Sequence, residues 1–284
     1  MTETIHPDAT IGTVYLTVSN LDRSLGFYQD VLGFRLHRRD DQTAALGTGG
    51  PDLLHLSERP GARPVRGVTG LYHFAILVPS RRHLALSLRR LAETRTRLQG
   101  FADHLVSEAV YLADPDGNGI EIYRDRPRAE WPRLDGGIQM ASDPLDMDGI
   151  MAELNGRDEA WSGLYPQTTI GHIHLHVSHI PAAEAFYTNV LGFDLILRWH
   201  QAGFVSAGGY HHHIGYNTWA GVGAPPPPPD AVGLRWFEIC LPDEDALKVV
   251  AGRVRQAGWP LEERAEGLFL RDPAQNGIML CSAI

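Results

Sequence analysis

An internal repeat constrains the fold of this chain more than any other feature of its sequence. The segment IGTVYLTVSNLDRSLGFYQDVLGF (11–34) recurs 159 residues later, without a gap, as IGHIHLHVSHIPAAEAFYTNVLGF (170–193). A weaker match joins GLYHFAILVP (70–79) to GLRWFEICLP (233–242). Because repeats indicate a duplicated architecture, we divide the chain into four modules of about 50 residues each.

Each module has the same predicted order of elements. It opens with apolar residues that alternate with polar ones, as in a half-buried strand: Val14, Leu16 and Val18. A stripe at helical spacing follows, made of Leu21, Leu25, Tyr28 and Leu32, and Gly33 is well placed to end the helix. A third match, DPDGNGIEIY (114–123) with DPAQNGIMLC (272–281), supplies a turn and a final strand. We therefore predict an α+β fold of four βαβββ modules.

The modules are expected to form two domains. We place an N-terminal domain of two modules at residues 1–128 and a C-terminal domain of two modules at residues 167–284. Residues 129–166, rich in Pro, Asp and Gly, break the pattern and are predicted to be a linker. The PPPPP run at 225–229 is typical of a stiff polyproline connection between the third and fourth modules.

The composition of the chain argues against several classes of function. The net charge is −9, and no basic run stands out, so nucleic-acid binding is not expected. Only two cysteines occur, Cys240 and Cys281, without zinc-type spacing or a disulfide framework. The N-terminus lacks a secretory pattern, and no apolar run is long enough to span a membrane. We expect a reduced, cytoplasmic protein.

With these repeats, the sequence resembles the vicinal oxygen chelate superfamily of glyoxalases, extradiol dioxygenases and antibiotic-resistance binders. The resemblance covers nearly the whole chain outside the linker, and it is nearest to two-domain catechol 2,3-dioxygenases. It implies that the modules pair into open, cup-like sheets, each a partial barrel. It also implies a divalent metal ion held by residues on the first and last strands of modules.

Four first-strand and two last-strand positions correspond to the ligand positions of that superfamily: Thr13, His73, His172 and Trp236, and then Glu121 and Met279. The extradiol pattern, two histidines and one glutamate, is met by His73, His172 and Glu121. This donor set is typical of non-haem Fe(II) oxygenases, and Mn(II) accepts the same ligands. Because these residues come from the second and third modules, those modules are predicted to pair, within one chain or between two.

The resemblance also implies residues that act on the substrate. The stretch GGYHHHIGYNTW (208–219) contains the region where extradiol enzymes carry a non-ligand acid–base histidine. His213, followed by a short apolar stretch, is the favoured candidate, and His212 remains the alternative. Tyr111, ten residues before Glu121, and His104 match further site positions of the family.

The predicted function is an Fe(II)-dependent extradiol dioxygenase that inserts both atoms of O₂ into catechol or a substituted catechol. The expected partners are therefore a small aromatic diol and O₂, without nucleic acid or membrane, in a homo-oligomer. Two alternatives stay open. One is a glyoxalase-like lyase or isomerase of the same superfamily, and the other is a non-catalytic drug-binding resistance protein.

Overall fold

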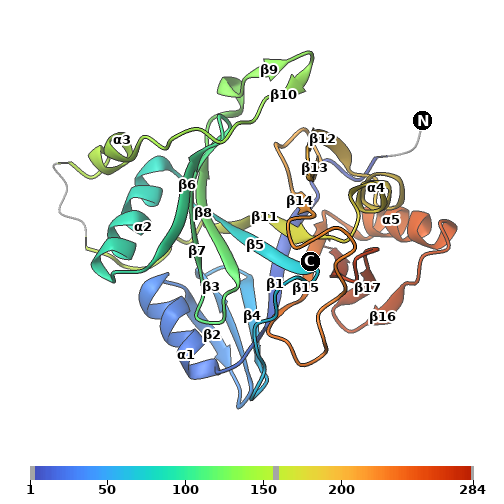
Figure 1. Cartoon of the computed structure of the whole chain (residues 1–284), viewed down its shortest axis with the longest axis horizontal. Helices are drawn as coiled ribbons and strands as arrows, with labels where there is room; N and C mark the ends of the chain where they lie inside the picture. The colour runs from blue at the N-terminus through green and yellow to red at the C-terminus, as the bar shows by residue number, and fades with distance from the viewer. Residues whose placement is uncertain (1–3, 156–159, 283–284) are drawn as a thin grey trace. The chain divides into compact units, whose positions relative to one another are not determined.

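The computed structural model (Figure 1) describes residues 4–155 and 160–282 of the chain. It is an α+β structure with two eight-stranded sheets, which confirms the predicted fold class. The outermost residues of the two predicted domains and residues 156–159 of the predicted linker lie outside the described part. Within that part, none of the helices has the length and apolar character needed to span a membrane.

The described residues group into two compact units. The N-terminal unit contains those in the ranges 18–62 and 73–170, and the C-terminal unit contains residues 4–17, 63–72 and 171–282. Three of the boundaries fall inside strands; at one of them, Tyr72 and His73 are covalent neighbours on one strand but belong to different units.

The first module comprises β1 (Thr10–Val18), α1 (Leu21–Gly26), a π-helical turn (Phe27–Val31), β2 (Arg35–Arg39), β3 (Thr43–Gly47) and β4 (Asp52–Glu58). Asn20 starts α1, because its side chain accepts a hydrogen bond from the Arg23 N–H. Gly33 follows the helical segment with φ +84°, a left-handed conformation that glycine adopts without strain. The predicted helix and its end are thus confirmed, with a π-helical last turn.

The second module comprises β5 (Gly70–Leu77), α2 (Arg81–Glu93), β6 (Leu98–Asp103), β7 (Ser107–Ala113) and β8 (Gly119–Asp125). Ser80 caps α2 by accepting a hydrogen bond from the His83 N–H. The helix buries Leu84, Leu88 and Leu91, and Figure 1 shows it lying along the strands β6 to β8. That face of the sheet is therefore covered, and the opposite face is left for functional side chains.

The third module comprises β11 (Thr169–His176), α4 (Ile180–Ala185), a π-helical turn (Phe186–Val190), β12 (Asp194–Trp199), β13 (Ala202–Ser206) and β14 (Ile214–Asn217). The fourth comprises β15 (Gly233–Leu241), α5 (Glu244–Gln256), β16 (Glu262–Arg264), β17 (Gly267–Arg271) and β18 (Gly277–Ser282). Pro181 lies in the first turn of α4, as predicted, because its missing N–H has no helical partner there.

The segment between the second and third modules has structure of its own: a 3-10 turn (Arg128–Glu130), β9 (Arg133–Leu134), β10 (Gly137–Ile138) and α3 (Met147–Ala152). The two short strands pair antiparallel, and α3 packs against α2. Arg81 of α2 donates a hydrogen bond to Asp146, the N-terminal cap of α3, at 2.9 Å. This segment is therefore bound to the second module within the N-terminal unit.

A buried tyrosine–aspartate hydrogen bond is repeated in both units. The Tyr28 hydroxyl donates to Asp114 at 2.9 Å, and the Tyr187 hydroxyl donates to Asp272 at the same distance. In each case the tyrosine of one module's helical segment is tied to the last turn of the other module. Burial, with the neighbouring carboxylate, raises the pKa of both tyrosines well above the usual value.

The order of hydrogen-bonded strands tells which modules share a sheet. One sheet runs β16-β17-β18-β15-β1-β4-β3-β2, and the other runs β12-β13-β14-β11-β5-β8-β7-β6. The first sheet therefore combines the first and fourth modules, and the second combines the second and third. This is the pairing that the distribution of ligand-type residues predicts, and it occurs within one chain.

Candidate metal centre

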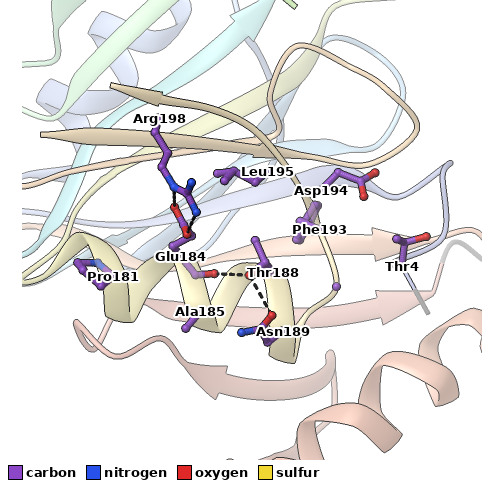
Figure 2. Close-up of a pocket in the computed structure, with 11 residues that line it drawn as sticks. Thr4, Pro181, Glu184, Ala185, Thr188, Asn189, Phe193, Asp194, Leu195 and Arg198 are labelled. Carbon is purple, nitrogen blue, oxygen red and sulfur yellow. Dashed lines mark hydrogen bonds and ion pairs between the residues drawn. The ribbon is translucent and has the colours of Figure 1, made fainter. Parts of the chain in front are cut away.

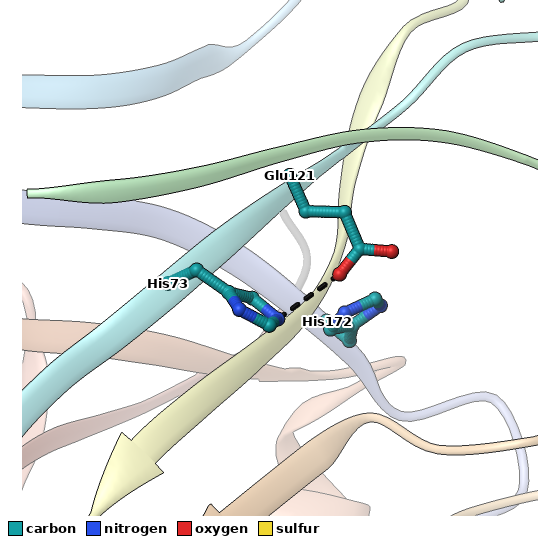
Figure 3. A group of neighbouring side chains, drawn as sticks. All are labelled: His73, Glu121 and His172. Atoms are coloured by element: carbon teal, nitrogen blue, oxygen red, sulfur yellow. Dashed lines mark ion pairs between the residues drawn. The ribbon is translucent and has the colours of Figure 1, made fainter. Parts of the chain in front are cut away.

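His73 of β5 and Glu121 of β8 form a buried ion pair in the N-terminal unit. The two strands run parallel, with Ala75 opposite Glu121, so alternate residues bring the His73 ring to the same face as the carboxylate. His73 Nε2 lies 3.0 Å from Glu121 Oε2, and both side chains are almost fully buried (Figure 3). A buried carboxylate requires a compensating positive charge or hydrogen bonds, which makes this pair a candidate ligand site.

His172 of β11 lies in the C-terminal unit, on a strand that is buried along nearly its whole length. Its ring packs 4.1 Å, centroid to centroid, from the ring of His212 and 6.2 Å from that of His211. In the same unit, Tyr72 packs 5.2 Å from His174, which lies two residues beyond His172. Tyr72, the residue before His73, therefore lies against β11, the strand that carries His172.

His73, Glu121 and His172 are a group that could hold a metal ion. One possible ligand atom from each lies within 4.8 Å of the others, and Figure 3 labels the three side chains. Two imidazoles and one carboxylate suit a borderline divalent ion such as Fe(II), and three protein ligands leave coordination positions open. The donor set therefore fits the ion that the sequence predicts.

Tyr111 and His104, also predicted to act on the substrate, lie in the N-terminal unit. Tyr111 lies opposite Glu121 in the β7–β8 ladder, and its ring is 5.6 Å from that of His73. The Tyr111 hydroxyl is 2.6 Å from His104 Nε2, and His104 Nδ1 is 2.7 Å from the Ala141 carbonyl. A carbonyl only accepts, so Nδ1 carries a proton; a neutral His104 then accepts the Tyr111 O–H at Nε2.

The Ala141 carbonyl is a contribution that the sequence did not indicate. It comes from the segment predicted as a linker, and backbone atoms carry no side-chain signal. By accepting a hydrogen bond from His104 Nδ1, this carbonyl favours the tautomer in which Nε2 accepts the hydrogen bond from the Tyr111 hydroxyl.

The histidine triplet precedes β14 and lies in a bend. The Ala207 N–H donates to His213 Nδ1 at 3.1 Å, and the Ser206 hydroxyl is 3.0 Å from the same nitrogen. The His213 ring packs near Phe193 and Tyr210, whereas the ring beside His172 is that of His212.

A separate pocket of about 440 Å³ lies along α4, the following π-helical turn and β12 in the C-terminal unit (Figure 2). Arg198 donates to both carboxylate oxygens of Glu184 across this pocket, at 2.7 and 2.5 Å. The residues that line it include none of the side chains predicted to act on metal or substrate. Its surface ion pair is a structural contact of α4 with β12.

The fold and the candidate site define a class of protein. Paired βαβββ modules that place two imidazoles and one carboxylate together are the framework of a metal-dependent enzyme with open coordination positions. The chain belongs to the Glyoxalase/Bleomycin resistance protein/Dioxygenase superfamily, whose family model matches residues 10–122 and 169–280.

Relatives agree with this assignment. The chain is 49% identical over 278 residues to the catechol-2,3-dioxygenase of Bacillus subtilis (strain 168), with 96% of each chain covered. The structure of a candidate dioxygenase from Bacillus subtilis matches with a TM-score of 0.66 and 15% identity, covering 99% of this chain and 86% of that one.

Glyoxalase I from Zea mays matches with a TM-score of 0.57 and 15% identity, covering 96% of this chain and 92% of that one. At such identities the two solved structures show the fold alone. The relative at 49% identity confirms the predicted enzyme class, a dioxygenase of this superfamily.

Proposed function

We propose that this protein is an extradiol dioxygenase that cleaves a catechol with O₂ and uses Fe(II) held by His73, Glu121 and His172. The observation that carries the proposal is the convergence of two imidazoles and one carboxylate within 4.8 Å. The name of the relative at 49% identity supports catechol as the substrate class. Mn(II) is the alternative ion, because it accepts the same nitrogen and oxygen donors.

When bound, the metal ion lowers the pKa of the catechol hydroxyls and holds the diol beside O₂. The side chains of this chain supply the rest. The Tyr111 hydroxyl donates its hydrogen bond to His104, so the Tyr111 oxygen can accept a hydrogen bond from a substrate hydroxyl. The ring of His73 beside Tyr111 sets the distance between this acceptor and the metal ligands.

We assign the acid–base role to His212 in place of His213. His212 packs against the proposed ligand His172, and its Nδ1 is 2.8 Å from His211 Nδ1, so the two rings can hold and pass one proton. His213 Nδ1 accepts the Ala207 N–H, and the His213 ring packs near Phe193 and Tyr210. In this assignment His213 positions the bend that carries His212.

Anaerobic loading with Fe(II), followed by catechol in air, tests the proposal. We expect one iron per chain and a ring-opened semialdehyde from cleavage beside the diol. His73→Ala should lose the iron and the activity. The exposed His200 provides the control, because it lies in the turn after β12 and is not one of the proposed ligands. Iron-replete protein that forms no ring-opened product with a range of catechols would exclude this function.

A further inference from the structure

The sheet of the first and fourth modules carries a second group of ligand-type side chains in the C-terminal unit. One possible ligand atom from each of Glu238, Cys240 and Cys281 lies within 4.8 Å of the others. Cys240 of β15 and Cys281 of β18 are register partners on parallel strands, and their sulfur atoms are 3.1 Å apart. These are the only two cysteines of the sequence, separated by 41 positions.

The group lies on the open face of its sheet. Along β15, Phe237, Ile239 and Leu241 are buried, whereas the alternating Glu238 and Cys240 are partly exposed. Both cysteines are free thiols that solvent can reach. A metal ion from solution therefore has access to all three side chains without unfolding the strand.

The three residues also stand close to the positions of the family ligands. Trp236 and Met279 occupy the places in the fourth module that His73 and Glu121 occupy in the second. Glu238 follows Trp236 by two residues, and Cys281 follows Met279 by two. Because side chains alternate along a strand, this shift of two keeps them on the same face of the sheet.

The carboxylate of Glu238 is held in place from β1. The Thr13 N–H donates to Oε2 at 3.0 Å, and the Tyr15 hydroxyl donates to Oε1 at 2.8 Å. Gly12 makes room for the group, because a Cβ at that position would lie 2.5 Å from the Cys240 sulfur and 2.8 Å from Glu238 Oε2. Hydrogen bonds that orient a ligand, and neighbouring residues that leave space for it, are typical of the surroundings of a metal site.

We propose that Glu238, Cys240 and Cys281 form a second metal site, selective for a thiophilic divalent ion of the Zn²⁺ class. At a Zn–S distance of about 2.3 Å, two thiolates of a tetrahedral ion lie about 3.8 Å apart. The sulfur atoms at 3.1 Å reach that spacing with a movement of less than about 1 Å. Two thiolates and one carboxylate leave the fourth position for water.

Titration of the reduced full-length protein with Co²⁺ tests this site. Thiolate ligands give Co²⁺ a near-ultraviolet sulfur-to-metal charge-transfer band that nitrogen and oxygen ligands do not produce. We expect one equivalent of this band, displaced by Zn²⁺. Cys240→Ser and Cys281→Ser should each lose it. The matched control is His172→Ala, which should keep the band while losing the iron of the proposed catalytic centre.

A variant that retains all three proposed ligands tests the hydrogen bond that orients Glu238. Tyr15→Phe removes the hydroxyl that orients Glu238, and loss of such an outer partner typically weakens metal affinity by about 10–100-fold. We expect that loss for Zn²⁺ by competition with a chelator, with unchanged iron content. A reduced protein that gives no thiolate band, or a band that persists in Cys281→Ser, would overturn the proposal.

Discussion

Substitutions of His212 and His213, two neighbours in the triplet, should differ in their effects on activity and on stability. His212→Ala removes the proposed acid–base ring beside His172. General acid–base groups contribute about 10²–10⁴-fold to rate, which corresponds to about 2.7–5.4 kcal/mol of transition-state free energy. The variant should lose turnover to this extent per bound iron. Its stability loss should include that of the hydrogen bond with His211, about 0.5–1.5 kcal/mol.

His213→Ala should have the opposite profile. It leaves the buried Ala207 N–H without its acceptor, which costs about 1–3 kcal/mol of unfolding free energy. Turnover per bound iron should stay close to that of the parent protein, because the His213 ring packs near Phe193 and Tyr210.

Two assays on the same preparations measure this difference. One follows ring-opened product at saturating catechol, normalised to iron content, and the other follows thermal or denaturant unfolding. If His213→Ala abolished turnover per iron while His212→Ala left it intact, the assignment from ring packing would be wrong. If His212→Ala and His213→Ala lost turnover equally and kept their stability, the hydrogen bond from Ala207 to His213 would not make His213 a structural residue.

Three further outcomes are expected. Tyr111→Phe removes the hydroxyl bonded to His104 and should lower kcat by about 10²-fold or more without loss of iron, as metal analysis and product formation would report. Tyr28→Phe and Tyr187→Phe should each lower the unfolding free energy by about 1–3 kcal/mol, measured in urea, because a buried aspartate loses a donor. Chelation of iron should lower the midpoint of thermal unfolding, because a ligand at 100 times its dissociation constant stabilises the folded protein by about 2.7 kcal/mol. The midpoint of His73→Ala should not change when the chelator is added.

The modules and the proposed ligand set follow from the sequence because duplication makes each position comparable with three others. His73 and His172 stand at equivalent strand positions, so their shared residue type is informative where a single histidine is not. The pairing of modules follows from the same comparison, because only the second and third modules together supply the complete set. The strand order agrees with that reasoning.

The triplet and the cysteines show what the sequence leaves undetermined. Alternation along a strand predicts which face a residue takes, but His211 to His213 lie in a bend before β14, where no such period applies. Cys240 and Cys281 become neighbours only through the parallel pairing of β15 with β18, which no local pattern encodes. The Ala141 carbonyl likewise acts through backbone position alone.

The two sheets therefore offer two donor sets of different softness on one duplicated framework. Imidazoles with a carboxylate suit Fe(II), whereas thiolates favour thiophilic ions, so the two sites should discriminate between metals by ligand type. In a mixture of Fe²⁺ and Zn²⁺ under anaerobic conditions, Cys281→Ser should bind less zinc with unchanged iron, and His172→Ala should bind less iron with unchanged zinc at Cys240 and Cys281. If removing the thiolates also removed the iron, the two groups would be energetically coupled, and the model of independent sites on separate sheets would fail.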